Sequence, residues 1–370
     1  MLRKLRLLRF KTFVLCLTLG VVAVSIVNIV ITHLYSPNAE FVYRRGPGAD
    51  DTHSADKILG KNEPMKWDLI TLERNVESLL KRLPYNTTAV RRYRTDFNAK
   101  TQAYEIDGKP ILWIYWDGPP KSAYIELCIL TAVCHNYGDF DIRVLNDTEF
   151  ISTVGWVHPA YKFLTSNHKS DYFRMAVLHL YGGVYHDADT ISFESMRELY
   201  KLLSDYDIVG PSARDGVLHF SNIGPIRANT TFSREWKSRL LEKLDEKFKT
   251  PHRGDPFQWI EIGGGLAVPV FERLLRENRT QHYGFSGAKT WLQFQVEDVI
   301  SENRDLLRNL NKTEILVLNN RLFPYMYRRM TMRGVLRSKR GVSQLIRYSL
   351  INCLKKVSLD PNLAHTLHLP

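Results

Sequence analysis

The hydrophobic residues of the chain follow three different patterns in turn. Residues 13–31, FVLCLTLGVVAVSIVNIVI, contain no charged side chain. Residues 67–83 then carry leucine and valine at three- to four-residue spacing, which is typical of an amphipathic helix. From about residue 109 onward, short apolar runs alternate with helical patterns, which predicts strands and helices in alternation.

The first pattern predicts a transmembrane helix. Its nineteen uncharged residues are about the length that a helix needs to cross the hydrocarbon core of a bilayer. Five basic residues lie within the first eleven, and the next is Arg44. The positive-inside rule therefore predicts a cytoplasmic tail at 1–11, an anchor at 12–35 and a lumenal or external remainder. A cleaved signal peptide is the alternative, but its apolar region typically spans only about 7 to 15 residues.

Composition divides the rest of the chain into three segments. Residues 36–105 form a polar stem, broken by proline and glycine, with one helical segment. This helix could dock on the following domain or pair with a second copy in a homodimer. Residues 106–325 form the main α/β domain, which carries the candidate chemistry, and residues 326–370 form a basic C-terminal segment.

The α/β domain opens with a strand, a helix and a second strand. ILWIYW at 111–116 and FDIRVLND at 140–147 are the strands, and the helix between them ends near His135. Such a β-α-β unit predicts a mostly parallel, Rossmann-like sheet covered by helices on both faces, with ligands beyond the carboxyl ends of the strands. Later strands are expected at 206–211, 221–226 and 314–325, with helices at 231–248 and after the glycines of 263–265.

Cysteine and asparagine usage indicates an oxidising, glycosylating compartment. One of the four cysteines, Cys16, lies in the predicted membrane helix, so at most one disulfide can form among the other three, Cys128, Cys134 and Cys353. Five Asn-x-Ser/Thr acceptors lie beyond the predicted membrane span: Asn86, Asn146, Asn229, Asn278 and Asn311.

The net charge of +12 is concentrated at the two ends of the chain. Residues 315–359 carry ten basic side chains and no Asp or Glu. A nucleic-acid-binding protein usually spreads its basic footprint over a recognition element, so this distribution argues against a nucleic-acid partner. The basic segment either contacts an acidic lipid headgroup, an anionic glycan or a diphosphate, or is a solvated tail.

The candidate chemistry lies in SDYFRMAVLHLYGGVYHDADT, residues 170–190. Asp171 and Arg174, three residues apart, share one face of a helix that a Gly-Gly pair ends. The chain has three Asp-x-Asp pairs, but only Asp187 and Asp189 follow such a helix and turn; the pairs at 139/141 and 205/207 have the context of ordinary turns.

An extended backbone would place both carboxylates of the pair on one side. In that geometry Asp187 and Asp189 face together about 6 to 7 Å apart at Cα, with Tyr185 on the same side. Two such carboxylates suit one hard cation, Mg²⁺ or Mn²⁺, which completes its shell with water and phosphate oxygens. The alternative is that Asp189 caps the following segment and Asp187 is a surface residue.

This segment resembles the Asp-x-Asp glycosyltransferases of the capsular-polysaccharide-synthesis type. Their relatives include Golgi α-mannosyl-, α-galactosyl- and α-N-acetylglucosaminyltransferases and the clostridial glucosylating toxins. The shared features are a Ser-Asp-x-x-Arg helix, a Tyr-Gly-Gly turn and an aromatic-x-Asp-x-Asp strand, which match at Ser170, Asp171, Arg174, Tyr181, Gly182, Gly183, Tyr185, Asp187 and Asp189. ILWIYW also resembles the family's first strand, whose tryptophan lies against the nucleotide base.

The resemblance implies a GT-A fold and a role for each matching residue. Asp171 and Arg174 would hold the sugar and phosphate region of the donor, Asp187 would approach the ribose and the water shell of the metal, and Asp189 would ligate Mn²⁺ or Mg²⁺ directly. The remaining donor-binding candidates are Trp113, Trp116, Ser170, Tyr185 and Asn222.

Two further features are weaker candidates for the same site. His365 and His368 stand near the end of the chain, where the family often adds a contact to the metal or diphosphate, although LAHTLHLP departs from the usual pattern. EIGGGLAVP at 261–269 is either a phosphate-binding helix start or a plain turn.

The implied activity is transfer of a hexose or N-acetylhexosamine from a UDP- or GDP-sugar to a glycan, glycolipid or glycoprotein. The family mostly retains the anomeric configuration, and its Golgi members imply a single-pass type II Golgi enzyme with a lumenal catalytic domain. A phosphatase of the Asp-x-Asp-x-Thr kind is excluded, because Ile191 stands where that motif needs threonine. A catalytically inactive Golgi module that binds glycans or scaffolds a partner is the alternative function.

Overall fold

The structure is a computed structural model that describes residues 69–81, 85–118, 120–211, 218, 224–249, 254–285, 288–290, 315–317 and 325–359. These residues all belong to one compact unit, 66–370. The predicted cytoplasmic tail and membrane anchor lie outside the described residues. Within the described ranges, no helix combines the length and the apolar character that crossing a membrane requires.

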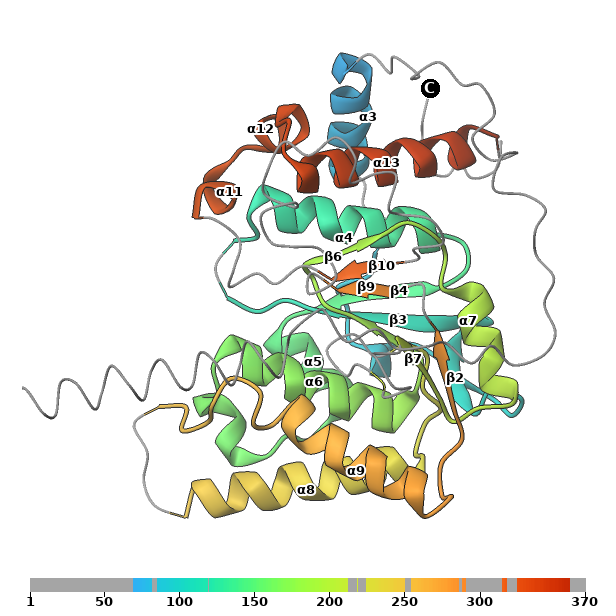
Figure 1. Ribbon diagram of the computed structural model, residues 1–370, viewed down its shortest axis with the longest axis vertical. Helices are drawn as coiled ribbons and strands as arrows, with labels where there is room; N and C mark the ends of the chain where they lie inside the picture. Colours follow the sequence, from blue (N-terminus) through green and yellow to red (C-terminus); the bar gives the residue numbers. More distant parts are fainter. Residues whose placement is uncertain are drawn as a thin grey trace, which may run out of the picture. The chain divides into compact units, whose positions relative to one another are not determined.

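Helices and strands alternate through most of the unit (Figure 1). The α-helices are α3 (Leu69–Lys81), α4 (Ala123–Asn136), α5 (Asp147–Val154), α6 (Ser166–Tyr181), α7 (Arg197–Lys201), α8 (Thr231–Lys247), α9 (Gly264–Arg276), α11 (Tyr325–Arg329), α12 (Met332–Arg337) and α13 (Gly341–Leu359). Short 3-10 helices are η1 (Val90–Arg92), η2 (Pro159–Phe163) and η3 (Leu202–Ser204). The strands are β1 (Asp96–Asn98), β2 (Ala103–Ile106), β3 (Lys109–Tyr115), β4 (Asp141–Leu145), β5 (Val184–His186), β6 (Thr190–Ser192), β7 (Ile208–Pro211), β8 (His282–Phe285), β9 (Ala288–Thr290) and β10 (Ile315–Val317).

The central sheet is built around β3, as the opening β-α-β pattern predicts. β4 pairs with β3 in parallel on one side, and β5 pairs with it in parallel on the other. β2 joins β3 antiparallel at its beginning, and β1 extends this hairpin. Ile226 bridges both Gly183 and Ile208, which connects β5 to the parallel pair β7 and β8. The carboxyl ends of β3, β4 and β5 therefore meet at one edge of the sheet.

Alternate residues of β3 face two different helical layers. Leu112 and Ile114 are buried in the core cluster that contains the buried side chains of α3, α4, α12 and α13. Ile111, Trp113 and Tyr115 are buried in a second cluster with those of α5, α6, α8 and α9. Figure 1 shows α4 and α13 on one side of the sheet and α6, α8 and α9 on the other. A mixed α/β architecture with helices on both faces of the sheet is thus confirmed.

The described part of the predicted stem, residues 36–105, does not form a separate segment, because it packs within the unit 66–370. α3 buries Leu72, Val76 and Leu79 in the core cluster of α4, and β1 and β2 pair with the central sheet. A boundary at 105/106 would cut through paired strands. The apolar side of the predicted helix docks within the chain, so this surface is already used and does not support a homodimer.

The basic C-terminal segment also packs into the same unit. α12 and α13 bury Val335, Leu336 and Leu345 against α4. On α12, Arg337 donates two hydrogen bonds to the carboxylate of Glu73 on α3, at 2.5 and 2.8 Å. A boundary at 325/326 is therefore no domain boundary either, and part of the basic charge is neutralised within the chain.

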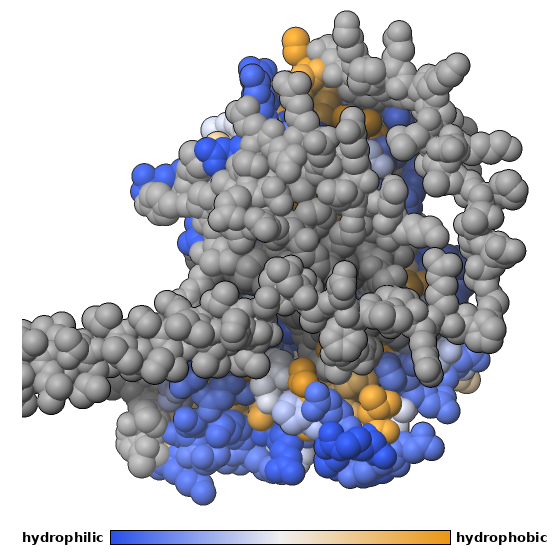
Figure 2. All heavy atoms as spheres, in the orientation of Figure 1, coloured by the Kyte–Doolittle hydropathy of each residue, from blue (hydrophilic) through white to orange (hydrophobic). Residues whose placement is uncertain are grey.

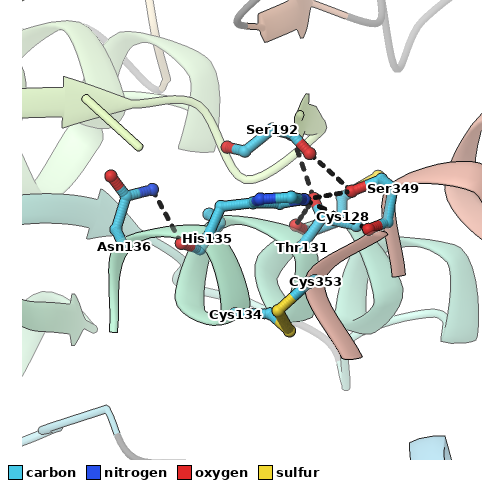
Figure 3. The surroundings of a disulfide bond; sticks show 9 residues. Cys128, Thr131, Cys134, His135, Asn136, Ser192, Ser349 and Cys353 are labelled. Atoms are coloured by element: carbon cyan, nitrogen blue, oxygen red, sulfur yellow. Dashed lines mark hydrogen bonds between the residues drawn. A yellow bond between two sulfur atoms is a disulfide. The ribbon is translucent and has the colours of Figure 1, made fainter. Parts of the chain in front are cut away.

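A disulfide joins α4 to α13 through Cys134 and Cys353 (Figure 3). Beside it, the ring Nε2 of His135 lies 3.1 Å from the hydroxyl oxygen of Ser349. The Ser349 hydroxyl in turn donates to the carbonyl of Ser192 on β6 at 2.5 Å. Burial lowers the pKa of His135 to about 3, so this imidazole is neutral at physiological pH. This disulfide agrees with the limit of one that the cysteine count sets, and the third cysteine of the described chain, Cys128, is a buried thiol.

We expect reduction of this disulfide to lower the stability of the unit. The bond closes a loop of 219 residues, and disulfides of this kind contribute about 2 to 4 kcal/mol. Urea unfolding with and without dithiothreitol measures the loss, with the double variant Cys134→Ser/Cys353→Ser as the control that no longer responds to the reductant. Equal midpoints for the oxidised and reduced wild-type protein would contradict this role.

Candidate active site at the carboxyl edge of the sheet

The turn from α6 into β5 depends on two glycines. Gly182 and Gly183 have φ angles of +69° and +99°, a region that favours glycine. A Cβ on Gly183 would lie 2.4 Å from the carbonyl oxygen of Ile111 on β3. Glycine therefore lets the chain leave the helix and enter the sheet beside β3 at once, which confirms the predicted Gly-Gly turn.

Arg174 is the centre of the candidate site. Its guanidinium donates to Asp171 on the same helix at 3.2 Å and to Asp187 after β5 at 2.9 Å. It also lies over the ring of Tyr185, 4.5 Å from the centroid, while the Tyr185 hydroxyl donates to Asp187 at 2.7 Å. Arg174 and Tyr185 are buried. The structure thus brings together four of the predicted site residues in one hydrogen-bonded group.

Burial shapes the titration of this group. The pKa of Asp171 is raised to about 6, first by burial and then by the charge of Asp187, against the opposing effect of Arg174. Burial disfavours the charged form of Arg174, but Asp187, Tyr185 and Asp171 outweigh it and raise the pKa of the guanidinium. Arg174 is therefore always charged, whereas Asp171 changes its charge near the lower end of the physiological range.

The backbone at the two aspartates is a turn rather than the extended segment that was expected. β5 ends before the motif, and the amide of Thr190 donates to the carbonyl of Asp187 at 3.1 Å, which closes a turn. Asp187 points to the α6 side, where it contacts Arg174. Burial raises the pKa of Cys128 and of Tyr124 on α4, and the charge of Asp189 raises both further. The strict alternation of an extended strand therefore does not apply to the two aspartates.

The donor set nevertheless fits a hard divalent cation. Asp187 and Asp189 supply carboxylate oxygens, both residues are partly exposed, and hydrogen bonds from Arg174 and Tyr185 fix the first of them. Within the described ranges, no group of three or more His, Cys, Asp or Glu residues gathers as a cation site. A cation held by Asp187 and Asp189 would take its other ligands from phosphate and water, as Mg²⁺ commonly does.

Two tryptophans were candidates for a contact with a nucleotide base. Trp113 has no exposed surface and donates its ring N–H to the carbonyl of Gly182 at 2.8 Å. It therefore fixes the Gly-Gly turn from inside the core, and a base-stacking role for it does not fit the structure. Trp116 follows the end of β3 and is partly exposed.

Within the described ranges, the other predicted donor-binding residues are not seen in contact with this group. Ser170 donates its hydroxyl to the carbonyl of Asn167 within α6. Asn222, His365 and His368 lie outside the described residues.

A second polar cluster at this edge was not expected. Asp117 follows β3, Asp147 follows β4, and Lys169 of α6 forms ion pairs with both. The hydroxyls of Tyr115 and Tyr161 donate to Asp147 at 2.5 and 2.6 Å. Polar residues placed directly after two predicted parallel strands were the available sequence signal.

The segment before α9 also contacts the site. A Cβ on Gly263 would lie 2.4 Å from Oδ1 of Asp171, so the glycine allows the backbone to lie against this carboxylate. His168, which precedes Arg174 on α6, bonds through Nδ1 to Asp255 at 2.5 Å. The glycine run at 263–265 is therefore a turn that leads into α9, and Gly263 forms part of the wall around Asp171.

Residues 61–208 match the model of a protein family described as glycosyltransferase sugar-binding region containing DXD motif. The match includes Arg174 and both aspartates of the turn. This part of the chain is similar to that family. Among solved structures, the chain is similar to one titled PaToxG Glycosyltransferase, with 13% sequence identity and a TM-score of 0.32 over 56% of this chain and 79% of that one. No curated protein sequence matches the chain.

The raised pKa of Asp171 predicts a pH-dependent stability. The folded-state pKa of about 6 exceeds the ordinary value of 3.8, so the folded protein holds this proton more tightly. The resulting stabilisation is present below pH 4 and is lost as the pH rises through about 6. Relative to wild type, Asp171→Asn should therefore gain up to about 3 kcal/mol in its free energy of unfolding between pH 4 and pH 7.

Urea unfolding in the presence of EDTA measures this difference, because the chelator removes any contribution from bound cations. Asp205→Asn is the matched control, since Asp205 is exposed and belongs to a different Asp-x-Asp pair. A difference between wild type and Asp171→Asn that stays constant from pH 4 to pH 7 would contradict the raised pKa.

Proposed function

We propose that the protein is a glycosyltransferase that moves a hexose or N-acetylhexosamine from a UDP- or GDP-sugar to a hydroxyl group of a glycan, glycolipid or glycoprotein. The observation that carries the proposal is the ion-paired group of Asp171, Arg174 and Asp187 beside Asp189. It lies at the carboxyl ends of parallel strands, where α/β sheets bind their ligands. It also falls within the segment that matches the glycosyltransferase family.

The proposed mechanism assigns the carboxylates by their surroundings. Asp187, held by Arg174 and Tyr185, and Asp189 would hold Mn²⁺ or Mg²⁺. When bound, this cation supplies positive charge that stabilises a diphosphate leaving group. Asp171 is ionised above a pH of about 6 and would accept hydrogen bonds from the hydroxyls of the donor sugar. Trp116, beyond the end of β3, would border the nucleotide base.

The family resemblance favours retention of anomeric configuration and a GT-A fold for this enzyme. Each carboxylate of the ion-paired group has a neighbour that fixes it: Asp171 contacts Arg174, and Asp187 contacts Arg174 and Tyr185. None of them is placed as a dedicated base in the proposed mechanism. Positioning and electrostatic stabilisation of the leaving group would then supply most of the rate acceleration.

Substitution of the turn carboxylate tests the catalytic proposal. We expect Asp189→Asn to lower turnover of nucleotide sugar by about 100-fold or more, because a ligand that anchors the cation loses its charge. Release of nucleoside diphosphate from UDP- and GDP-sugars in the presence of Mn²⁺ is the measurement, and Asp205→Asn is the control. Equal rates for wild type and Asp189→Asn would overturn the role of Asp189. Donor binding without turnover by the wild type would favour the inactive glycan-binding module.

We further propose that the protein is a single-pass type II membrane protein of the Golgi with this domain in the lumen. The disulfide between Cys134 and Cys353 supports an oxidising compartment, because disulfides are rare in the cytosol. Three glycosylation acceptors in the described residues are exposed: Asn146, Asn229 and Asn278. Asn86 is half-buried and donates its amide to Tyr93 at 2.8 Å, which makes it a poorer acceptor, and Asn311 lies outside the described residues.

Glycosylation of the exposed acceptors tests this location. The protein expressed in a secretory cell should lose mass on treatment with peptide-N-glycosidase, and Asn229→Gln and Asn278→Gln should each remove one glycan. Asn146 is less suitable for substitution because its side chain caps α5 by accepting from the amide of Glu149 at 3.0 Å. A protein that carries no glycan after passage through secretory cells would contradict the lumenal placement.

A further inference from the structure

The loop of residues 254–263, which precedes α9, is fastened to the beginning of α6. Asp255 accepts hydrogen bonds from the amide and the hydroxyl of Thr165, at 2.6 and 2.8 Å, and bonds to Nδ1 of His168 at 2.5 Å. The other ring nitrogen of His168 lies 2.9 Å from the carbonyl oxygen of Gln258. The side chains of His168 and Asp255 are both only 4% exposed. Buried polar contacts therefore fix the first half of the loop.

The second half of the loop ends at the candidate active site. Gly263 lies against the carboxylate of Asp171, where any larger residue would clash. Between the two attachment points, Phe257 packs against the ring of His168 and against Phe248 at the end of α8, with centroid distances of 5.8 and 6.2 Å. Glu261 forms ion pairs with α8 through Lys243 and Lys247. The loop is thus supported along its length rather than only at its ends.

This supported loop carries large apolar side chains at the surface. Trp259 is 46% exposed and Ile260 is 65% exposed, although apolar residues usually bury most of their area. The turn that bears them is internally bonded, because Glu261 donates its amide to Gln258 and Gly265 donates its amide to Ile260, at 3.0 and 2.8 Å. Hydrophobic side chains reach the surface on the α8 and α9 side of the molecule, among hydrophilic ones (Figure 2).

The loop borders the active site on the side opposite the expected base contact. Phe257 and Ile262 pack in the core cluster of α6, α8 and α9, whereas Trp116 packs against the cluster of α4 on the other face of the sheet. Of the site carboxylates, Asp171 is the one that Gly263 touches. Under the proposed function, Asp171 contacts the donor sugar, so the loop lies next to the sugar that is transferred rather than next to the nucleotide.

We propose that Trp259 and Ile260 form the acceptor subsite, in which the indole of Trp259 stacks on the apolar face of the acceptor's sugar ring. The inference rests on the proposed function, because it assigns the second substrate of the same site. A pyranose ring presents C–H groups on one face, and an aromatic side chain offers a large, flat apolar surface with few rotatable bonds. The rigid turn means that little conformational entropy is lost when the sugar binds.

Replacement of the indole separates acceptor binding from donor binding. We expect Trp259→Ala to raise the KM for the acceptor about tenfold or more, a larger change than in the KM for the donor. Trp259→Phe should recover most of the loss, because it keeps a flat ring. Trp156→Ala is the matched control, since Trp156 is 57% exposed on the segment after α5. The acceptors are the methyl glycosides of mannose, galactose and N-acetylglucosamine, with the donor found in the turnover assay.

Direct binding gives a second readout that does not depend on turnover. The same methyl glycosides should change the tryptophan fluorescence of wild type and of Trp156→Ala, and the change should be lost in Trp259→Ala. Equal acceptor KM values, or an unchanged fluorescence response in Trp259→Ala, would overturn the subsite while leaving the transferase proposal intact. Absence of any nucleotide-sugar turnover by wild type would instead overturn the proposed function. Turnover without a response to any of the three glycosides would also count against the subsite.

Discussion

The candidate site depends on one buried charge. Arg174 brings a guanidinium into the space between α6 and the sheet, and the desolvation of such a group costs several kcal/mol unless it is paired. Asp171 from its own helix and Asp187 from beyond β5 provide the pairing, and the face of Tyr185 covers the guanidinium. Asp187 contributes the largest opposing charge, and Asp171 adds a second, weaker contact from the helix that carries Arg174. The position of α6 relative to β5 is therefore coupled to the geometry of the active site.

Side chains alternate between the two faces of a strand, and this alternation decides which residues can join the ion-paired group. Tyr185 faces the layer of α6, as Trp113 and Tyr115 do on the neighbouring strand. Asp187, two residues after Tyr185, keeps that direction and reaches Arg174. The turn that follows breaks the alternation at Asp189, whose charge raises the pKa of Tyr124 on α4 after burial. A motif that has the spacing of an alternating pair thus lies partly on a turn.

Local sequence patterns were sufficient to predict most helices and strands, but not the contacts between distant residues at the candidate site. The predicted β-α-β opening, the helix at 231–248 and the Gly-Gly turn all agree with the structure, because they follow from periodicity and glycine placement. Asp141 and Asp207, members of the two other Asp-x-Asp pairs, form ion pairs with Arg143 and Arg227, and Asp141 lies in β4 rather than in the expected turn. In contrast, the contact of Gly263 with Asp171 joins residues 92 positions apart in the sequence, and spacing within a motif carries no information on such packing.

Sequence patterns also carry no information on which distant segments pack together, and this explains why the predicted boundaries of the stem and of the C-terminal segment differ from the structure. A polar, basic composition described the C-terminal segment correctly, yet every few residues of α12 and α13 carry an apolar side chain that the α4 layer buries. The ion pair between Arg337 and Glu73 joins helices that are 264 residues apart, so composition read along the chain could not reveal it. Charge counts describe the solvent-facing side of a helix, whereas the buried side determines the domain to which it belongs.

The layer of α4 consequently contributes to the site although it carries none of the predicted site residues. Asp189 is close enough to α4 for its charge to affect Cys128, and α4 itself is held by the disulfide to α13 and by the hydrogen bonds of Ser349 to β6. Under the proposed function, a cation shared by Asp187 and Asp189 would join the α6 layer to the α4 layer at the edge of the sheet. The packing of α13, remote in sequence from the motif, would then help to set the distance between the two carboxylates.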